Sequence, residues 1–159
     1  MTPLTITSNF LAKLIVIRLT RIPVALFVHS PSRTTVVRVD HLPGSRKKKV
    51  NSSLPSAKRF RRYPAVLIGR LGVNINFADK GIGSELMDIL KMWSILPDNK
   101  AACRFLAVDS YNQSRTIHYY QKNGFDFLFS TEEQEADNAA IDLPLTTRYM
   151  YFDLINVVN

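Results

Sequence analysis

The sequence contains one cysteine, Cys103, among 159 residues, which excludes an internal disulfide and a cysteine-based zinc site. We therefore do not expect a secreted fold held together by disulfides. We expect a reducing, cytoplasmic location. His29 and His41 have no acidic or cysteine partners at metal-ligand spacing, so the sequence indicates no metal. Glycine and proline occur six and eight times, ordinary frequencies that exclude a collagen-like or wholly low-complexity chain.

Uninterrupted apolar segments of membrane-spanning length are also missing. Residues 10–28 are rich in Leu, Ile and Val, but Lys13, Arg18 and Arg21 interrupt them, and each central cation costs about 2.5–3.5 kcal/mol on insertion. Residues 1–9 carry no positive side chain, which argues against a signal peptide. We expect a buried strand pair or an irregular apolar segment here and no membrane partner, with a membrane-surface role as the minor alternative.

Acidic residues are scarce in the first 70 positions, where Asp40 stands against fourteen Lys and Arg. The rest of the chain reverses this balance, with twelve acids and seven cations. The asymmetry indicates either a nucleic-acid partner or a poorly folded basic leader, and like-charge blocks are most often solvated surface. The candidate nucleic-acid-binding residues form a basic flank over residues 46–62: Arg46, Lys47, Lys48, Lys49, Lys58, Arg59, Arg61 and Arg62.

The chain length and a hydrophobic content of 46% fit one domain with a real core. The clearest signals follow residue 63: apolar strands, an amphipathic helix opened by glycines, and a second helix capped by Asn112 and ended by Gly124. The predicted strands cover 65–73, 104–109, 125–129 and 149–154, the helices 82–93 and 113–123, and an acidic loop 132–142. This order predicts an α+β (three-layer α/β) domain with a mixed sheet over residues 63–159, after a divergent or partly disordered segment 1–45 and the basic flank.

Gly81-Ile82-Gly83 at the start of a helix, after a buried strand and a short loop, predicts an anion cradle. The free N–H groups of a first helical turn point at an anion, and a diphosphate suits them. A P-loop is excluded because its Gly-Lys-Ser/Thr ending is missing, and a dinucleotide fingerprint is excluded because position 86 is Leu86.

Two separate motifs resemble the GNAT N-acetyltransferase superfamily, over about residues 63–155. The first joins the strand segment ending in Leu71-Gly72-Val73 to the loop Lys80-Gly81-Ile82-Gly83-Ser84. The second is Asp109-Ser110-Tyr111-Asn112 followed by Tyr119-Tyr120-Gln121-Lys122-Asn123-Gly124-Phe125, which looks like the "asparagine, then F-Y-x-K-x-G-F" signature of the family. The resemblance implies a GNAT-like sheet with helices on both faces and two central parallel strands that splay apart.

The resemblance also implies acetyl-CoA as co-substrate and direct transfer of its acetyl group to a primary amine. Tyr120 would be the general acid that protonates the departing thiolate, although its helical spacing from Ile117 also fits a core residue. The loop departs from the family pattern at Ala78, where Gln or Arg is usual. The residues implied in coenzyme binding are Leu71, Gly72, Val73, Asp79, Lys80, Gly81, Ile82, Gly83, Ser84 and Asn112.

Three functions stay open. The first is an N-acetyltransferase whose acceptor amine belongs to a small molecule, a peptide or an aminoacyl-tRNA; the last would make it a GNAT toxin with an antitoxin partner. The second is a non-catalytic module that binds nucleic acid or coenzyme A. The third is an inactive acetyltransferase. This alternative is open because the N-terminal strand and helices of the family are not recognisable in residues 1–50. A homodimer is compatible with all three.

Overall fold

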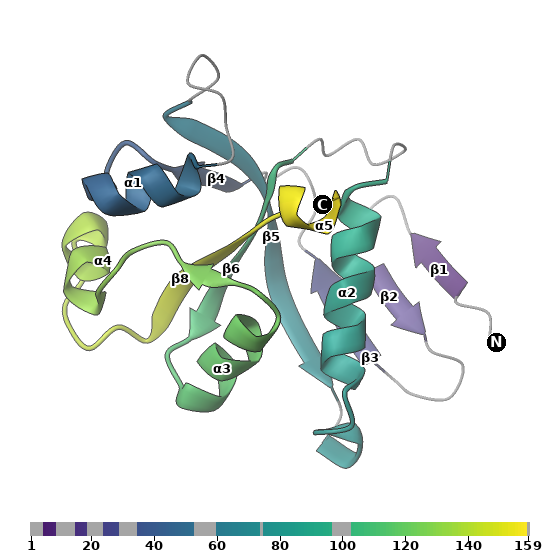
Figure 1. Ribbon diagram of the computed structural model, residues 1–159. Coiled ribbons are helices and arrows are strands. Elements are labelled where there is room, and N and C mark those ends of the chain that lie inside the picture. The colour runs from purple at the N-terminus through teal and green to yellow at the C-terminus, as the bar shows by residue number, and fades with distance from the viewer. Residues whose placement is uncertain are drawn as a thin grey trace.

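The structure, a computed structural model, describes residues 35–52, 60–73, 75–96 and 103–158, and the backbone of residues 5–8, 15–18 and 24–28 (Figure 1). Its strands are β1 (Thr5–Ser8), β2 (Ile15–Arg18), β3 (Val24–Val28), β4 (Thr35–Arg38), β5 (Arg62–Val73), β6 (Phe105–Tyr111), β7 (Asp126–Phe127) and β8 (Thr147–Asp153). Its helices are α1 (Gly44–Val50), the 3-10 turn η3 (Ile75–Phe77), α2 (Ile82–Ser94), α3 (Ser114–Lys122), α4 (Glu132–Ala139) and α5 (Ile155–Val158).

All eight strands belong to one mixed sheet in the order β1-β2-β3-β5-β6-β8-β7, with β4 paired to β5 beside β3. Strands β5 and β6 are parallel, and the other pairs are antiparallel. The mixed sheet is therefore confirmed. Of the two alternatives expected within residues 10–28, a buried strand pair or an irregular apolar segment, the backbone shows paired strands, β2 and β3; their burial lies outside what the structure describes.

The two central strands separate partway along their length. Their parallel pairing ends at Ile68 and Val108, while β5 runs on to Val73 and β6 to Tyr111. Beyond this point β5 stays paired with β3, and β6 stays paired with β8. Figure 1 shows β5 and β6 close together at one end and diverging at the other, so the predicted splay is confirmed. We call the opening between them the fork.

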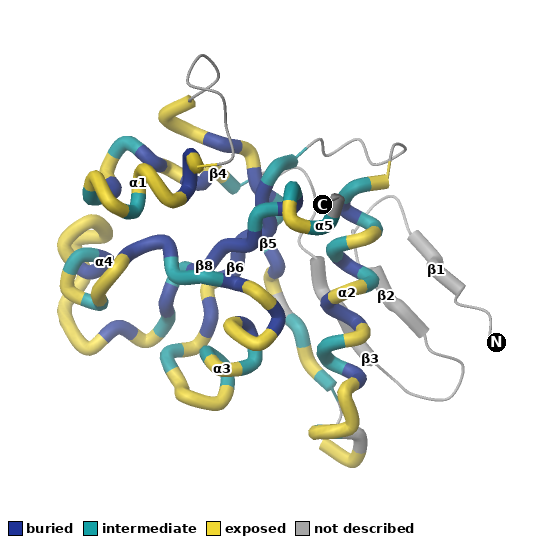
Figure 2. The backbone as a smooth tube through the Cα atoms, viewed as in Figure 1, coloured by how far each residue is buried: buried dark blue, intermediate teal, exposed yellow. Residues whose placement is uncertain are grey.

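Alternating side chains of the central strands form two separate cores, and Figure 2 shows these strands as the most buried part of the chain. On one face, Leu106 and Val108 pack under α2 and α3; on the other, Phe105 and Ala107 pack with Val50 of α1. We call these the α2 face and the α1 face. Each fully buried Leu, Val or Phe contributes about 1.5–3 kcal/mol, so both faces hold the sheet together.

The predicted acidic loop 132–142 is wrong, because its first part is the helix α4. Thr131 caps this helix by accepting a hydrogen bond from the Gln134 N–H at 3.3 Å, and the Gln134 side chain accepts one from the Ser130 N–H. Glutamates in the first turn are further stabilised by the helix dipole. The Thr-x-x-Gln capping pattern was the sequence signal for this helix.

The basic run 46–49 is not a loose solvated segment but part of α1. The Arg46 side chain is mostly buried, donates to the Leu128 carbonyl at 3.3 Å and pairs with Asp126 at 3.4 Å. Lys49 pairs with the same carboxylate. Burial alone would raise the pKa of Asp126, but Lys49 and Arg46 hold it below its usual value. Part of the basic flank thus serves to attach α1.

Two smaller differences concern the C-terminal half. The strand predicted over 125–129 is limited to Asp126–Phe127, and α4 and α5 extend the predicted element order. Gly124 ends α3 with a φ of 81°, the left-handed conformation expected for a glycine at that position. No helix among the described residues has the length and apolarity needed to cross a membrane.

Candidate functional site

The predicted anion cradle lies where η3 leads into α2, next to the open end of the fork. Gly81 has a φ of 80°, which turns the chain into the helix, and its carbonyl accepts from the N–H groups of Ser84 and Glu85 at 3.0 and 3.1 Å. The N–H groups of Ile82 and Gly83 make no backbone hydrogen bond with any residue the structure describes. Free first-turn amides at the positive end of a helix suit a phosphate group.

Gly83 has a second reason to be a glycine. A Cβ at this position would lie 3.1 Å from the Tyr119 ring, whose hydroxyl donates to the Gly83 carbonyl at 2.6 Å. This contact packs α3 tightly against the first turn of α2. The two motifs, 36 residues apart in sequence, are therefore joined directly at the cradle.

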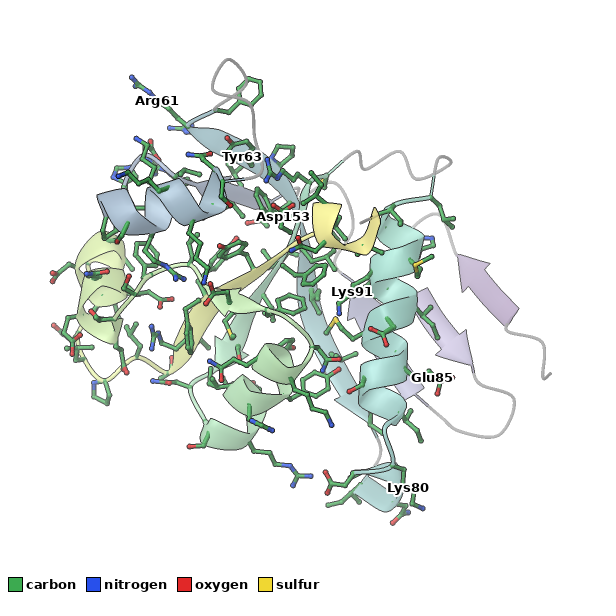
Figure 3. All side chains as sticks on the ribbon, viewed as in Figure 1. Arg61, Tyr63, Lys80, Glu85, Lys91 and Asp153 are labelled. Atoms are coloured by element: carbon green, nitrogen blue, oxygen red, sulfur yellow. The ribbon has the colours of Figure 1, made fainter. Side chains whose placement is uncertain are left out.

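Charged side chains flank the same loop. Asp79 takes a left-handed φ of 59°, which Asp tolerates better than most residues, and pairs with Arg115 of α3 at 3.0 Å. Lys80 is exposed beside them (Figure 3). Arg115 was missed in the sequence because it lies outside both motifs, yet the fold brings its cation to the cradle.

The segment Leu71-Gly72-Val73 forms the β5 side of the fork. On one edge these residues pair with β3. On the other edge they do not pair with β6. Backbone groups along an unpaired strand edge can pair with an extended ligand. The structure thus leaves the edge of β5 that faces the fork available for an extended ligand.

Tyr120 lies on α3 in the core of the α2 face. It is 6% exposed, and its ring packs edge-on against Tyr119 and Phe125, with centroids 5.2 and 5.4 Å away. Burial raises its pKa to about 12, so the phenol keeps its proton at neutral pH. The residue has the burial of a core side chain and the protonation state of a proton donor, and its catalytic role remains a prediction.

Asn112 does not cap α3, so this prediction is wrong. The N-cap is Gln113, which makes no side-chain capping bond. The Asn112 amide instead donates to the Leu145 carbonyl at 2.9 Å and to Glu132 at 3.1 Å. These bonds tie the end of β6 to the segment between α4 and β8.

The exposed cations of the basic flank that the structure describes lie on α1 and at the start of β5. Arg61 and Arg62 are exposed at the start of β5, and Lys47 and Lys48 are exposed on α1. Lys58 and Arg59 fall outside the described residues. Figure 3 shows Arg61 and Lys80 at opposite ends of the molecule, so the exposed cations of β5 are far from the cradle.

A pocket of about 290 Å³ on the α1 face was not foreseen from the sequence. Strand β4, the end of β6, helix α4 and strand β8 line it, and its polar groups include Asp109 and Tyr149. No short motif marks these two residues as partners. Only the pairing of β6 with β8, which sets them directly opposite each other, brings them together.

No protein-family model and no curated protein matches this sequence. Among solved structures, a bacterial toxin is similar over 87% of this chain and 71% of its own, at 12% identity and a TM-score of 0.53. AtaT complexed with acetyl-methionyl-tRNAfMet is similar over 92% of this chain and 74% of its own, at 15% identity and a TM-score of 0.53. At these identities the likeness shows the fold alone, and the expected GNAT-like fold is confirmed.

Proposed function

We propose that this protein is an N-acetyltransferase that moves the acetyl group of acetyl-CoA to a primary amine. The observation that carries this proposal is the fork between β5 and β6, with the cradle at the start of α2 beside its open end. An extended thioester can lie in the fork while its diphosphate meets the helix. Few other ligands combine a long neutral arm with a diphosphate.

The residues of the chain fit such a ligand by their chemistry. The free amides of Ile82 and Gly83 and the helix dipole would hold the pyrophosphate, with Lys80 and Arg115 adding positive charge. Backbone groups of Leu71 and Val73 would pair with the arm, and the Leu71 N–H would polarise the thioester carbonyl. Ala78 supplies no side-chain contact at the start of the loop, so the backbone carries more of the binding.

The reaction needs one new bond and two proton transfers. The amine nitrogen attacks the thioester carbon, the C–N bond forms, and the C–S bond then breaks. The nitrogen loses one proton and the thiolate gains one. Tyr120 would donate to the thiolate, since its pKa of about 12 keeps the phenol protonated at neutral pH.

An aminoacyl-tRNA is the acceptor class to test first. AtaT, which shares the fold, has been captured with acetyl-methionyl-tRNAfMet. The exposed cations Lys47, Lys48, Arg61 and Arg62 could neutralise phosphates, and an antitoxin would then be expected as a protein partner. A peptide or small amine acceptor would need none of these cations.

Calorimetry with acetyl-CoA tests the proposal directly. We expect micromolar binding by the full chain and a loss of at least about tenfold in Gly83→Val, whose side chain would displace Tyr119 from the cradle. Gly44→Val is the matched control, because nothing lies within 4 Å of a Cβ there. Transfer of radiolabelled acetyl groups to charged tRNA, uncharged tRNA, peptides and polyamines then identifies the acceptor. Absence of acetyl-CoA binding below millimolar concentration would refute the proposed function.

A further inference from the structure

The pocket on the α1 face lies beside the point where the fork begins. Asp109 is the first residue of β6 after its last pair with β5, and it lines this pocket. A volume of about 290 Å³ is close to the lower end of the roughly 300–1,000 Å³ of small-ligand pockets. The pocket suits one compact group, and its apolar wall comprises Val36, Leu128, Phe129, Ile141 and Leu145.

Two polar residues that line this pocket lie side by side on the sheet. Asp109 and Tyr149 are register partners on β6 and β8, so their side chains leave the same face of the sheet about 5 Å apart at Cβ. The Tyr149 hydroxyl is buried without a hydrogen-bond partner among the described residues. Burial raises the pKa of Tyr149, the side chain of Thr35 lowers it, and the charge of Asp109 raises it. An unpartnered buried hydroxyl is costly unless a ligand pairs with it.

Asp109 is the uncommitted carboxylate of the pocket. Glu135 accepts from Arg148 and from the Tyr149 N–H, whereas Asp109 makes no hydrogen bond or ion pair with any described residue. Removal of water by its neighbours raises the pKa of Asp109, although the residue stays accessible to solvent. Arg38 and His41 also line the pocket, but both are placed against Asp40.

We propose that this pocket receives the acceptor of the transfer reaction and that Asp109 is the residue that binds its amine. The inference rests on the proposed function, which it extends to the acceptor. The acceptor is then a primary amine on a compact apolar group, such as the α-amino group of an aliphatic amino acid. Its nitrogen enters the fork from the α1 face, while the diphosphate of the coenzyme stays on the α2 face.

This position also gives Asp109 a chemical step. The carboxylate accepts a hydrogen bond from the amine and directs its lone pair at the thioester carbon. Formation of the C–N bond makes the nitrogen cationic and strongly acidic, and Asp109 takes its proton. Tyr120 gives one proton to the departing thiolate, and solvent returns the proton from Asp109 to Tyr120, so that the protons balance.

The test uses leucinamide as the probe and needs no turnover. With the full-length ¹⁵N-labelled chain, we expect leucinamide to shift the amide signals of Thr147 and Tyr149 and to bind Asp109→Asn about 10–100-fold more weakly, since one charge-assisted hydrogen bond is lost. The uncharged analogue 2-hydroxy-4-methylpentanamide should bind the wild type as weakly as leucinamide binds Asp109→Asn. Asp142→Asn, an exposed carboxylate outside the pocket lining, is the matched control and should bind leucinamide as the wild type does.

The outcomes separate this inference from the proposed function. Equal leucinamide affinity in wild type and Asp109→Asn, or signal changes away from the pocket, overturns the inference even if acetyl-CoA binds. Leucinamide binding that depends on Asp109, together with no acetyl-CoA binding, supports the pocket and overturns the acetyltransferase. If both ligands bind, Asp109→Asn should lower kcat/KM for the acceptor about 10–100-fold with an unchanged Kd for acetyl-CoA.

Discussion

The two faces of the sheet at the fork differ in the charge they can receive. On the α2 face, backbone N–H groups at the start of α2 meet Lys80 and Arg115, an arrangement for an anion. On the α1 face, Asp109 and the Tyr149 hydroxyl meet apolar side chains, an arrangement for a cation or an N–H donor. A single gap between two strands can therefore bring ligands of opposite charge together from opposite sides.

The difference explains why the net charge of the whole chain, +8, is a poor guide to function. Some cations stabilise the fold itself, since Arg46 and Lys49 pair with Asp126. In the proposed arrangement, the carboxylate of Asp109 meets the amine of the acceptor at the fork, whereas the exposed lysines of α1 lie outside the pocket lining. Local charge at the fork, not the total, decides what binds.

The largest expected effect is a difference in kcat between variants of two tyrosines. The two are equally buried but lie on opposite faces of the sheet. Tyr120 on the α2 face and Tyr151 on the α1 face are each 6% exposed, and burial raises the pKa of both to about 12. Tyr120→Phe should lower kcat by about 10²–10⁴, the usual contribution of a general acid, with acetyl-CoA affinity unchanged. Steady-state kinetics and calorimetry measure the two quantities.

Tyr151→Phe is the control for this prediction. It removes an equally buried phenol from the other face and should leave kcat within about threefold, with at most about 1.5 kcal/mol lost in stability. If both variants keep wild-type turnover, Tyr120 is a core residue and the donor lies elsewhere. If both variants lose turnover equally, the phenol on the α2 face has no special role in the reaction.

The α2 face could be predicted from the sequence far better than the α1 face. Gly81, Gly83 and Tyr120 lie in short motifs whose spacing reflects local geometry: a helix start, a close contact and a helical face. The pocket depends on the register of β6 with β8 across the acidic segment, and on the side chains of β4. No local pattern encodes such a distant pairing, so Asp109 was read only as part of a motif.

The two errors in secondary structure have different causes. The helix α4 was missed because its acidic composition was given more weight than its Thr131 capping pattern. The Asn112 cap was wrong because its side chain is held by Leu145 and Glu132, residues that the sequence could not place nearby. Tertiary hydrogen bonds thus decided the position of the Asn112 side chain, whereas a local pattern marked the start of α4.

A second prediction concerns the support of the pocket. Glu135 accepts from Arg148 at 2.7 Å and from the Tyr149 N–H, and both charged side chains are 10% exposed. Glu135→Ala leaves a buried cation without its partner and should destabilise the protein by about 3–5 kcal/mol. Urea denaturation measures this loss. Asp137→Ala, an exposed acid on the same helix, should change stability by less than about 0.5 kcal/mol.

Glu135→Ala also tests whether the faces act separately. The variant removes the anchor of Tyr149 but touches nothing on the cradle. At a temperature where it stays folded, it should weaken leucinamide binding more than acetyl-CoA binding. An equal loss of both affinities would mean that the two faces are coupled through the sheet.

The smallest expected effect belongs to the surface pair beside the cradle. Arg115 and Asp79 are 3.0 Å apart and largely exposed, so their mutual attraction contributes little to stability. Their effects on an anionic ligand should have opposite signs: Arg115→Ala should raise the Kd for acetyl-CoA about two- to fivefold, and Asp79→Asn should lower it, because a competing carboxylate is removed. Calorimetry at low and high salt measures both variants. Because exposed charges are screened, the difference between them should shrink as salt rises, whereas the contribution of the buried backbone amides should not. A salt-independent difference, or the same sign in both variants, would show that Arg115 does not act on the ligand through its charge.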